Sequence, residues 1–265
     1  MKIARYLAHG QISYGMVDGD SVKELSASPY GDYTVTDHTH PIDHVKLLPP
    51  SEPTKILAIG LNYSSHLHDR EAPAEPMVFY KTPTSLIGPG ETIIRPKGTA
   101  KLDAEGELVI IIKDRCRNVS KADAMKHVLG YTCGNDVSAR DWQKDDRNWW
   151  RAKSADTFSP AGPYMETELD PHNVRLICRI NGKDVQNEST TYLIFDIPYI
   201  VNNTLMVIGI LGILFYKSWE LTLYVLLPVP FIIIGSSMIW QRMEAHWRRW
   251  SAKWSRLSSH LNESI

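Results

Sequence analysis

The chain has 265 residues, of which 43% are apolar, and its formal net charge at pH 7 is −1. This length suits one large domain or two small ones, and the apolar fraction is sufficient for a sizeable core. An odd number of cysteines without a CxxC spacing argues against a disulfide framework and a thiolate zinc site; the three are Cys116, Cys133 and Cys178.

Charge and motifs exclude several function classes for the first 200 residues. Basic residues are balanced there by acidic ones, and no basic stripe predicts nucleic-acid binding. The motifs GxxxxGK(S/T), HExxH and GxSxG are absent, as is a glycine-rich dinucleotide fingerprint after a strand. The N-terminus has no apolar run long enough for a signal peptide, so we expect this part of the chain in the cytoplasm.

Taken in chain order, the first 50 residues carry short alternating stretches broken by glycines, which predict a small β-rich module. Residues 62–71 form either a short helix or a mobile loop. Further strands are predicted at residues 55–60, 77–80, 92–95, 107–112 and 128–132.

Ser120 predicts the start of a helix that runs to His127, and a further segment begins over residues 136–141. Residues 174–180 form a predicted strand, and the Asn181-Gly182 turn predicts a hairpin with the strand that follows it. Strands outnumber helices in this interpretation, so we expect a β-rich α+β fold.

Two glutamates, Glu105 and Glu107, stand at the start of the apolar run at residues 108–112, and Asp136 follows a second apolar segment. Alternate side chains of a strand share a face, so both glutamates point the same way. Three ionised carboxylates placed together repel one another unless a cation lies between them. This pattern predicts a site for a hard divalent metal, although strand faces exposed to solvent also carry carboxylates.

Five ordered blocks resemble the fumarylacetoacetate hydrolase family over about residues 1–200. They are Asn62-Tyr63-Ser64-Ser65-His66, the stretch from Phe79 to Ser85, Leu102-Asp103-Ala104-Glu105-Gly106-Glu107-Leu108, the stretch from Gly134 to Asp141, and the stretch from Lys153 to Pro163. The resemblance implies mixed sheets in a barrel-like core and a homodimer.

The resemblance also implies a cofactor and a chemistry. Glu105, Glu107 and Asp136 match the ligands of Mg²⁺ or Mn²⁺, with Ca²⁺ as a further candidate. Substrates would be small 2-oxo or β-dicarbonyl acids, and the metal would stabilise an enolate. C–C bond hydrolysis, decarboxylation and isomerisation all remain open.

Other matches supply candidate catalytic and binding residues. Lys153 matches the active-site lysine, and His66 matches a lid histidine that activates water with a carboxylate. That carboxylate is Asp69 or Glu71. The substrate-binding candidates, each of which also suits a structural role, are Lys81, Arg140, Gln143 and Gln186.

The pattern changes after residue 200, which suggests three parts: residues 1–50, 51–200 and 201–265. Residues 204–240 contain two charged side chains, Lys217 and Glu220, and Leu221–Trp240 is 20 residues long without a charge. A helix of that length crosses about 30 Å of hydrocarbon. We expect a transmembrane hairpin at residues 204–240, followed by a basic amphipathic tail that is either solvated or binds lipid or a partner.

The C-terminal part resembles a different family. Residues 203–265, especially residues 214–223 and 256–264, resemble part of a membrane domain of an ATP-binding-cassette exporter. The Pro-Gly-Asp turn and the Gly-Thr-Pro segment that close the hydrolase barrel are absent. The hydrolase barrel would then be incomplete. The alternative to an enzyme is therefore a non-catalytic fusion or chimera that carries a transporter fragment.

Overall fold

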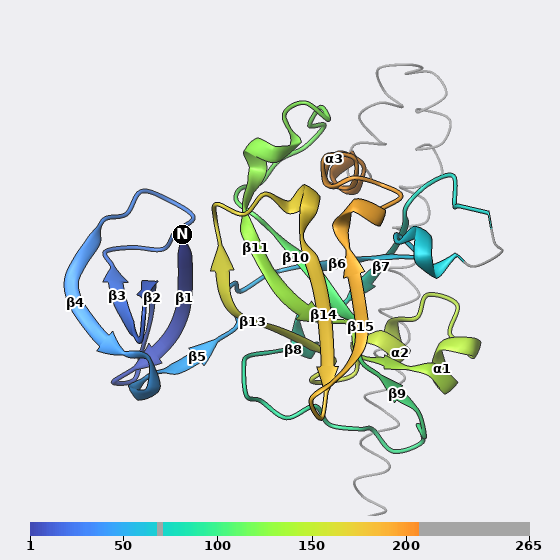
Figure 1. Ribbon diagram of the computed structural model, residues 1–265, viewed down its shortest axis with the longest axis horizontal. Coiled ribbons are helices and arrows are strands. Elements are labelled where there is room, and N and C mark those ends of the chain that lie inside the picture. Colours follow the sequence, from blue (N-terminus) through green and yellow to red (C-terminus); the bar gives the residue numbers. More distant parts are fainter. Residues whose placement is uncertain (68–70, 207–265) are drawn as a thin grey trace, which may run out of the picture. The chain divides into compact units, whose positions relative to one another are not determined.

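Strands dominate the computed structural model, which describes residues 1–67 and 71–206 (Figure 1). The largest sheet has the order β10-β11-β13-β1-β2-β3-β4, with β5 paired to β1 and β8 paired to β13. Its strands are β1 (Lys2–Ala8), β2 (Gln11–Asp18), β3 (Ser21–Leu25), β4 (Val35–Pro41), β5 (Lys46–Leu48), β8 (Leu86–Ile87), β10 (Gly106–Ile112), β11 (Val128–Asn135) and β13 (Ser159–Glu166).

Three two-stranded sheets complete the strands: β6 (Ile56–Gly60) with β7 (Met77–Lys81), β9 (Leu102–Asp103) with β12 (Ser138–Ala139), and β14 (Arg175–Ile180) with β15 (Lys183–Ser189). The α-helices are α1 (Arg140–Asp145), α2 (Trp150–Ser154) and α3 (Ile197–Met206). The 3-10 helices are η1 (Ile42–His44), η2 (Ser64–His66), η3 (Pro83–Ser85), η4 (Ala124–His127), η5 (Pro171–Asn173) and η6 (Thr190–Tyr192). The observed fold is therefore mostly β-sheet, as the patterns predict.

The apolar run in β10 is covered on both faces of its sheet, with Ile111 buried and its neighbours half-buried. Ile111 packs in a core with Ile3 and Met165, whereas Ile110 packs against the core that Tyr131 and Ile197 form on the other face. A strand covered on both faces has no polar side to alternate with, which explains the continuous apolar run. This doubly covered strand gives the candidate site a rigid base.

The first 50 residues join the same sheet. Ile3 of β1 pairs with Met165 of β13 in an antiparallel ladder, and β2, β3 and β4 follow as successive neighbours. The hydrophobic faces of these strands cover one another, and Tyr6 and Val22 are fully buried. The N-terminal strands thus extend the sheet that carries the candidate site.

Two expected elements are wrong. Residues 92–95 form no strand, because they lack a backbone partner strand: the N–H of Ile94 donates instead to the Thr157 hydroxyl at 2.8 Å. The helix expected from Ser120 to His127 is a turn followed by η4 alone. Val128 already pairs with Ile112 in the sheet, so too few residues remain for an α-helix to propagate.

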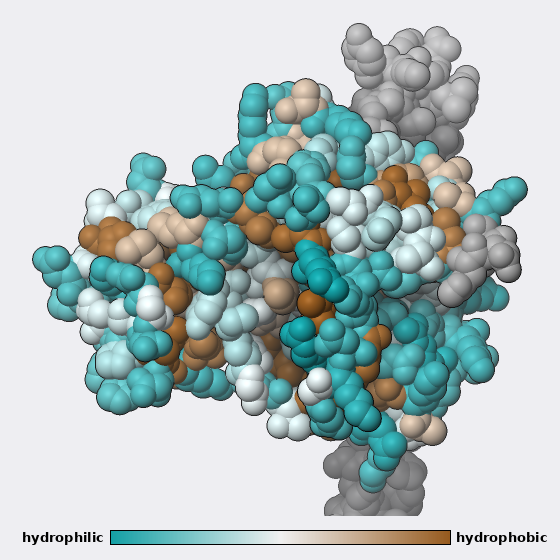
Figure 2. All heavy atoms as spheres, in the orientation of Figure 1, coloured by the Kyte–Doolittle hydropathy of each residue, from teal (hydrophilic) through white to brown (hydrophobic). Residues whose placement is uncertain are grey.

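The expected transmembrane hairpin at residues 204–240 and the basic tail after it lie outside the described residues, except for the end of α3. Among the residues that the structure describes, no helix is long and apolar enough to cross a membrane. Figure 2 shows a largely hydrophilic face around the β14–β15 hairpin, with hydrophobic residues in small patches between polar ones.

Candidate active site

The three predicted carboxylates come from the paired ends of β10 and β11. Gly106 pairs with Asn135, and the backbone N–H of Asp136 donates to the carbonyl of Glu105 at 2.9 Å. The Asn135 side chain also accepts from the N–H of Glu105 at 3.0 Å. This pairing holds Asp136 beside the Glu105-Gly106-Glu107 segment, so residues separated by about 30 positions in the chain meet at one corner of the sheet.

Two buried lysines compensate the charge of these carboxylates. Lys153 Nζ forms ion pairs with Glu105 and, at 2.6 Å, with Asp136, and Lys81 Nζ lies 2.5 Å from the other oxygen of Asp136. Lys81 is 3% exposed and Lys153 is 4% exposed, so water screens neither ammonium group well. The site is therefore a desolvated network of charges rather than a set of surface ion pairs.

All three N–H groups of the Lys81 ammonium donate to acceptors within the protein. Its ammonium group also donates to the backbone carbonyls of Lys153 and, at 3.2 Å, Phe158. Burial lowers the pKa of Lys81, against the raising effect of the Asp136 charge. With three N–H groups and three acceptors, Lys81 holds Asp136 and the Lys153 backbone in place and has no donor left for a ligand.

Arg140 fixes Glu105 from the other side. Its guanidinium donates to Glu105 at 2.5 Å, to Asp103 at 2.8 Å and to the Gln143 side chain at 2.8 Å. Ser138 donates its hydroxyl to Glu105 at 2.8 Å. Glu105 is thus oriented by several donors that come from β12 and α1.

Glu105 and Glu107 have different pKa values because their surroundings differ. Burial by itself raises the pKa of Glu105, but the Lys153 ammonium and the Arg140 guanidinium outweigh it and lower that pKa to about 2. Burial, followed by the charges of Asp136 and Glu105, raises the pKa of Glu107 to about 8. Glu105 is therefore a carboxylate at neutral pH, whereas Glu107 is mostly protonated there.

The surroundings of the Glu107 carboxyl group test whether a metal ion fits this site. Among the described residues, its carboxyl group has no hydrogen-bond or ion-pair partner, although it lies close enough to Asp136 and Glu105 to feel their charges. Three carboxyl groups supply the all-oxygen donor set that Mg²⁺ and Mn²⁺ prefer. The donor chemistry therefore fits a hard divalent cation.

The distances show what must move for that ion. In the described part of the chain, the group of His, Cys, Asp and Glu side chains whose ligand atoms all lie within 4.8 Å of one another is Asp114, Cys116 and His127. The three carboxylates do not form such a group, since the Lys153 ammonium bridges Glu105 and Asp136. Bringing their oxygens around one ion requires side-chain rotation.

Gln186 supports the peptide between the two glutamates. Its side-chain oxygen accepts from the N–H of Gly106 at 2.8 Å, and its side-chain nitrogen donates to the Gly106 carbonyl at 2.7 Å. Both ends of the amide are thus used by backbone groups. The structure places Gln186 beneath the Glu105-Gly106-Glu107 segment, where it positions the glutamates.

His66 lies in η2 beside a carboxylate that was not among the candidates. Its Nε2 is 3.7 Å from Glu188 Oε1, and the His66 ring lies 5.8 Å from that of Tyr63. Asp69 lies outside the described residues, and Glu71 is exposed. Burial and then the charges of Glu107 and Glu188 raise the pKa of the Tyr63 hydroxyl.

The segment that carries His66 is anchored at its base. Asn62 accepts from the N–H of Phe195 at 2.9 Å and donates to its carbonyl at 3.1 Å, and Tyr63 bridges to Leu193. These contacts hold the first residues of the segment against the chain that follows β15. The backbone just before His66 is therefore held in place.

Sequence reasoning missed Ser138, Asp103 and Glu188 as parts of the site. A signal for Ser138 was available, because it stands two positions after Asp136 in the matched stretch from Gly134 to Asp141. Glu188 stands two positions after Gln186 on β15, so the two share a strand face. The sequence did not indicate that this face of β15 lies beside the segment that carries His66.

Two models of known protein families match this chain. The model "Fumarylacetoacetate (FAA) hydrolase C-terminal" matches residues 55–208, and "Rv2993c-like, N-terminal" matches residues 1–50. Neither model includes residues 209–265, where we expected a transporter fragment.

Relatives and solved structures agree with the models. The chain is 42% identical to a mitochondrial oxaloacetate tautomerase of Xenopus laevis over 156 residues, which cover 56% of this chain and 49% of that protein. A solved 5-carboxymethyl-2-hydroxymuconate delta-isomerase of Mycobacterium smegmatis is 38% identical, with a TM-score of 0.74 over 78% of this chain and 83% of that one.

A third similar protein was solved with ligands. The maleylpyruvate hydrolase of Sphingobium sp. SYK-6, in complex with manganese(II) and pyruvate, is 26% identical, with a TM-score of 0.62 over 78% of this chain and 83% of that one. The family model spans more than half of this chain, and the solved structures share its fold. The chain therefore belongs to the fumarylacetoacetate hydrolase family.

Proposed function

We propose that this chain is a divalent-metal-dependent enzyme that acts on small 2-oxo or β-dicarbonyl acids. The observation that carries the proposal is the buried corner in which Glu105, Glu107 and Asp136 meet Lys153. A structural ion-pair cluster does not need a third carboxyl group without a partner, whereas a cation site does. Oxaloacetate is the first substrate to test, because the tautomerase relative carries that name.

A cation held by Glu105, Glu107 and Asp136 would act as a Lewis acid on neighbouring oxygens of the substrate. The protein groups around the cation would hold its carboxylate ligands in place. Arg140 and Ser138 keep Glu105 ionised and oriented, and Lys81 holds the Asp136 side chain in place. A preorganised set of charges of this kind costs little reorganisation during the reaction.

Lys153 supplies the positive charge on the substrate side of the proposed site. Its ammonium has three donors, of which Glu105 and Asp136 use two. The remaining N–H can bind a substrate carboxylate or an oxygen that becomes negative during the reaction. Burial strengthens this interaction, because the ammonium is almost out of contact with water.

His66 and Glu188 are the proposed proton-transfer pair. The imidazole takes a proton from the carbon beside the oxo group or from a water molecule, and the Glu188 carboxylate stabilises the resulting imidazolium. His66 is half exposed, which allows it to return the proton to solvent or to product. Asp69 and Glu71 remain predicted partners from the same segment.

The test measures keto–enol conversion and decarboxylation of oxaloacetate, and hydrolysis of maleylpyruvate, by the full chain with Mg²⁺, with Mn²⁺ and with EDTA. We expect metal-dependent turnover of at least one of these acids. Asp136→Asn should abolish it, whereas Asp37→Asn, which changes an exposed aspartate of β4, should leave it intact.

Each result decides the proposal. Turnover that survives EDTA and Asp136→Asn alike would show that the carboxylates do not hold a required metal. No turnover of either acid in any of the three reactions, by a chain that remains folded, would contradict the proposed substrate class. The homodimer that the family resemblance implies stays a prediction, which light scattering can test in the same preparation.

The proton-transfer pair has its own prediction. Glu188→Gln should lower kcat by about 10–100-fold and shift the pH profile of kcat, with little change in KM, because general acid–base groups contribute on the order of 10²–10⁴-fold. His66→Gln should lower kcat at least as much. An unchanged pH profile in Glu188→Gln would assign His66 to Asp69 or Glu71 instead.

A further inference from the structure

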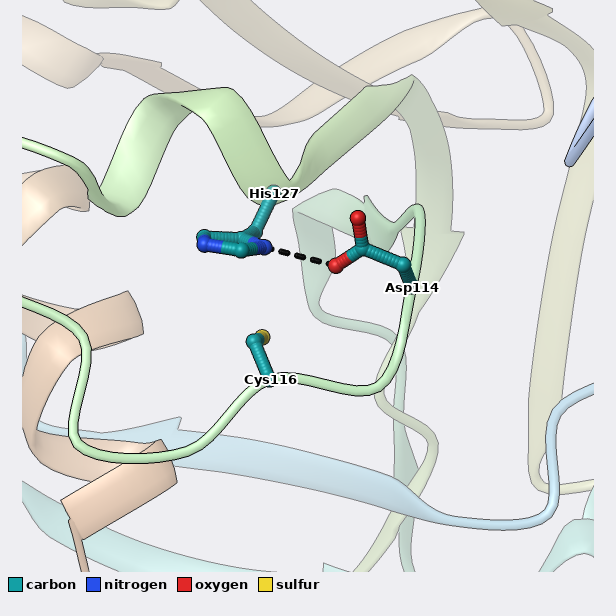
Figure 3. Close-up of side chains that lie close together, drawn as sticks. All are labelled: Asp114, Cys116 and His127. Carbon is teal, nitrogen blue, oxygen red and sulfur yellow. Dashed lines mark hydrogen bonds and ion pairs between the residues drawn. The ribbon is translucent and has the colours of Figure 1, made fainter.

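A second cluster of metal-binding side chains lies at the opposite end of β10. Asp114 and Cys116 belong to the loop that leaves β10, and His127 is the last residue of η4, directly before β11 (Figure 3). The N–H of Lys113 donates to the carbonyl of His127 at 2.7 Å, which holds the two segments together. Figure 3 shows the three side chains converging between these segments.

The cluster is already close to the geometry of a metal site. The ligand atoms of the three residues lie within 4.8 Å of one another, and His127 Nδ1 is 2.6 Å from Asp114 Oδ1. In a tetrahedral zinc site, with bonds of about 2.0–2.3 Å, ligand atoms lie roughly 3.3–3.8 Å apart. Displacement of the ligand atoms by about 1 Å is therefore sufficient to place an ion between them.

The donor set selects a kind of ion. One thiolate, one imidazole and one carboxylate suit Zn²⁺ and its neighbours in the transition series, whereas Mg²⁺ and Ca²⁺ prefer oxygen alone. Two negative ligands and a neutral imidazole would give a neutral complex with a divalent ion. Neutrality suits this place, since Cys116 and His127 are half-buried and Cys116 packs against an apolar core.

We propose that Asp114, Cys116 and His127 form a second metal site, which takes Zn²⁺ or a similar transition-metal ion and fixes the loop after β10 to the start of β11. Three protein ligands leave one position of the ion for water. Binding displaces a proton from the thiol, because sulfur binds the metal as thiolate.

This site is independent of the proposed active site. Glu107 stands near the start of β10 and Asp114 follows its end, so they lie seven residue steps apart along a nearly extended chain. At about 3.3 Å per residue, that distance is roughly 20 Å. A transition-metal ion at Cys116 therefore makes no contact with Glu105, Glu107 or Asp136.

The test uses Co²⁺ as a spectroscopic probe of the full chain, with excess Mg²⁺ present to compete for the all-oxygen site. Thiolate-bound Co²⁺ has a near-ultraviolet charge-transfer band that an oxygen-bound ion lacks. We expect this band in the wild type and its loss when Zn²⁺ is added. Cys116→Ser should abolish it, and Cys133→Ser, which removes an exposed thiol on β11, should keep it.

Further variants separate the two sites and guard against misfolding. Glu107→Gln should keep the band, and Asp114→Asn, at an exposed position, should weaken Co²⁺ binding by about tenfold or more. Circular dichroism in EDTA should match the wild type for each variant. A wild type without the band, or a band that survives Cys116→Ser, would overturn the proposal and leave the proposed enzymatic function untouched.

Discussion

Glu107 is the residue whose ionisation is most strongly coupled to its surroundings. Burial and two neighbouring carboxylates raise its pKa from an ordinary value of 4.5 to about 8. In the unfolded chain the group ionises near its ordinary value, so between these pH values the folded state binds more protons than the unfolded state. The stability that comes from protonated Glu107 is therefore complete below pH 4.5 and is lost as the pH rises through about 8.

This coupling gives a pH prediction for the metal-free protein. In EDTA, Tm should fall by a few degrees between pH 5.5 and pH 8.5, and Glu107→Gln should remove most of that fall. Glu105 does not contribute in this window, because its pKa is lowered to about 2. Differential scanning calorimetry measures the difference between wild type and variant, and parallel Tm curves for the two proteins would contradict the assignment.

Lys153 is expected to matter for stability as well as for chemistry. Replacing it by methionine leaves Glu105 and Asp136 buried with less positive charge, and removing one partner of a buried ion pair costs about 3–5 kcal/mol. Lys153→Met should therefore lower the free energy of unfolding in EDTA by that amount. Urea denaturation checks it, and saturating Mg²⁺ should restore part of the loss.

Lys126 offers a matched control for this variant. It pairs with Asp123 at 2.6 Å, a distance like that between Lys153 and Asp136, but its side chain is 74% exposed. Water screens such a pair, so Lys126→Met should change the free energy of unfolding little. Equal effects of the two substitutions would mean that burial does not set the strength of the Lys153 interactions.

At the scale of elements, β10, β11 and β13 leave no room for a side chain at Gly130. A Cβ atom there would lie 2.7 Å from Met165 Cγ and 2.8 Å from the Glu166 carbonyl. Gly130→Ala should therefore force the backbones apart and lower the free energy of unfolding by about 1–3 kcal/mol. Urea denaturation with an unchanged m-value measures this loss.

Gly31→Ala is the corresponding control. A Cβ atom at Gly31 meets nothing within 4 Å, and its backbone does not require a positive φ. Alanine there should be neutral or should stabilise the fold by about 0.4–1 kcal/mol, since it restricts the unfolded chain. If both alanines were equally destabilising, close packing of the strands would not be the cause.

Elements were predictable where the pattern is local. The strands β1, β6 and β10, which begin at residues 2, 56 and 106, follow their alternation or apolar runs. The Asn181-Gly182 hairpin turn has positive φ at both positions, as such turns require. The segment at residues 92–95 failed because a strand also needs a neighbour. Strand propensity indicates that a segment can pair, but only the fold provides the partner.

At the scale of the molecule, a bound cation should stabilise the folded chain. At a Mg²⁺ concentration 100 times its Kd, binding to the folded state alone adds about 2.7 kcal/mol to the free energy of unfolding. Tm should therefore rise with Mg²⁺ concentration in the wild type and stay constant in Asp136→Asn. A rise that persists in this variant would place the ion elsewhere.

The sequence by itself determined the β-rich fold, the family and the three carboxylates with Lys153, because these depend on the local period of strands and on motifs with a fixed order. The expected transmembrane hairpin lies beyond the described residues. Tertiary structure alone decided that Glu188 lies beside His66, that Lys81 donates to Asp136 and to two backbone carbonyls, and that Asp114 and Cys116 meet His127. The physical reason is that neighbours along the chain set which face a side chain occupies, whereas strand pairing sets which faces and loops come together.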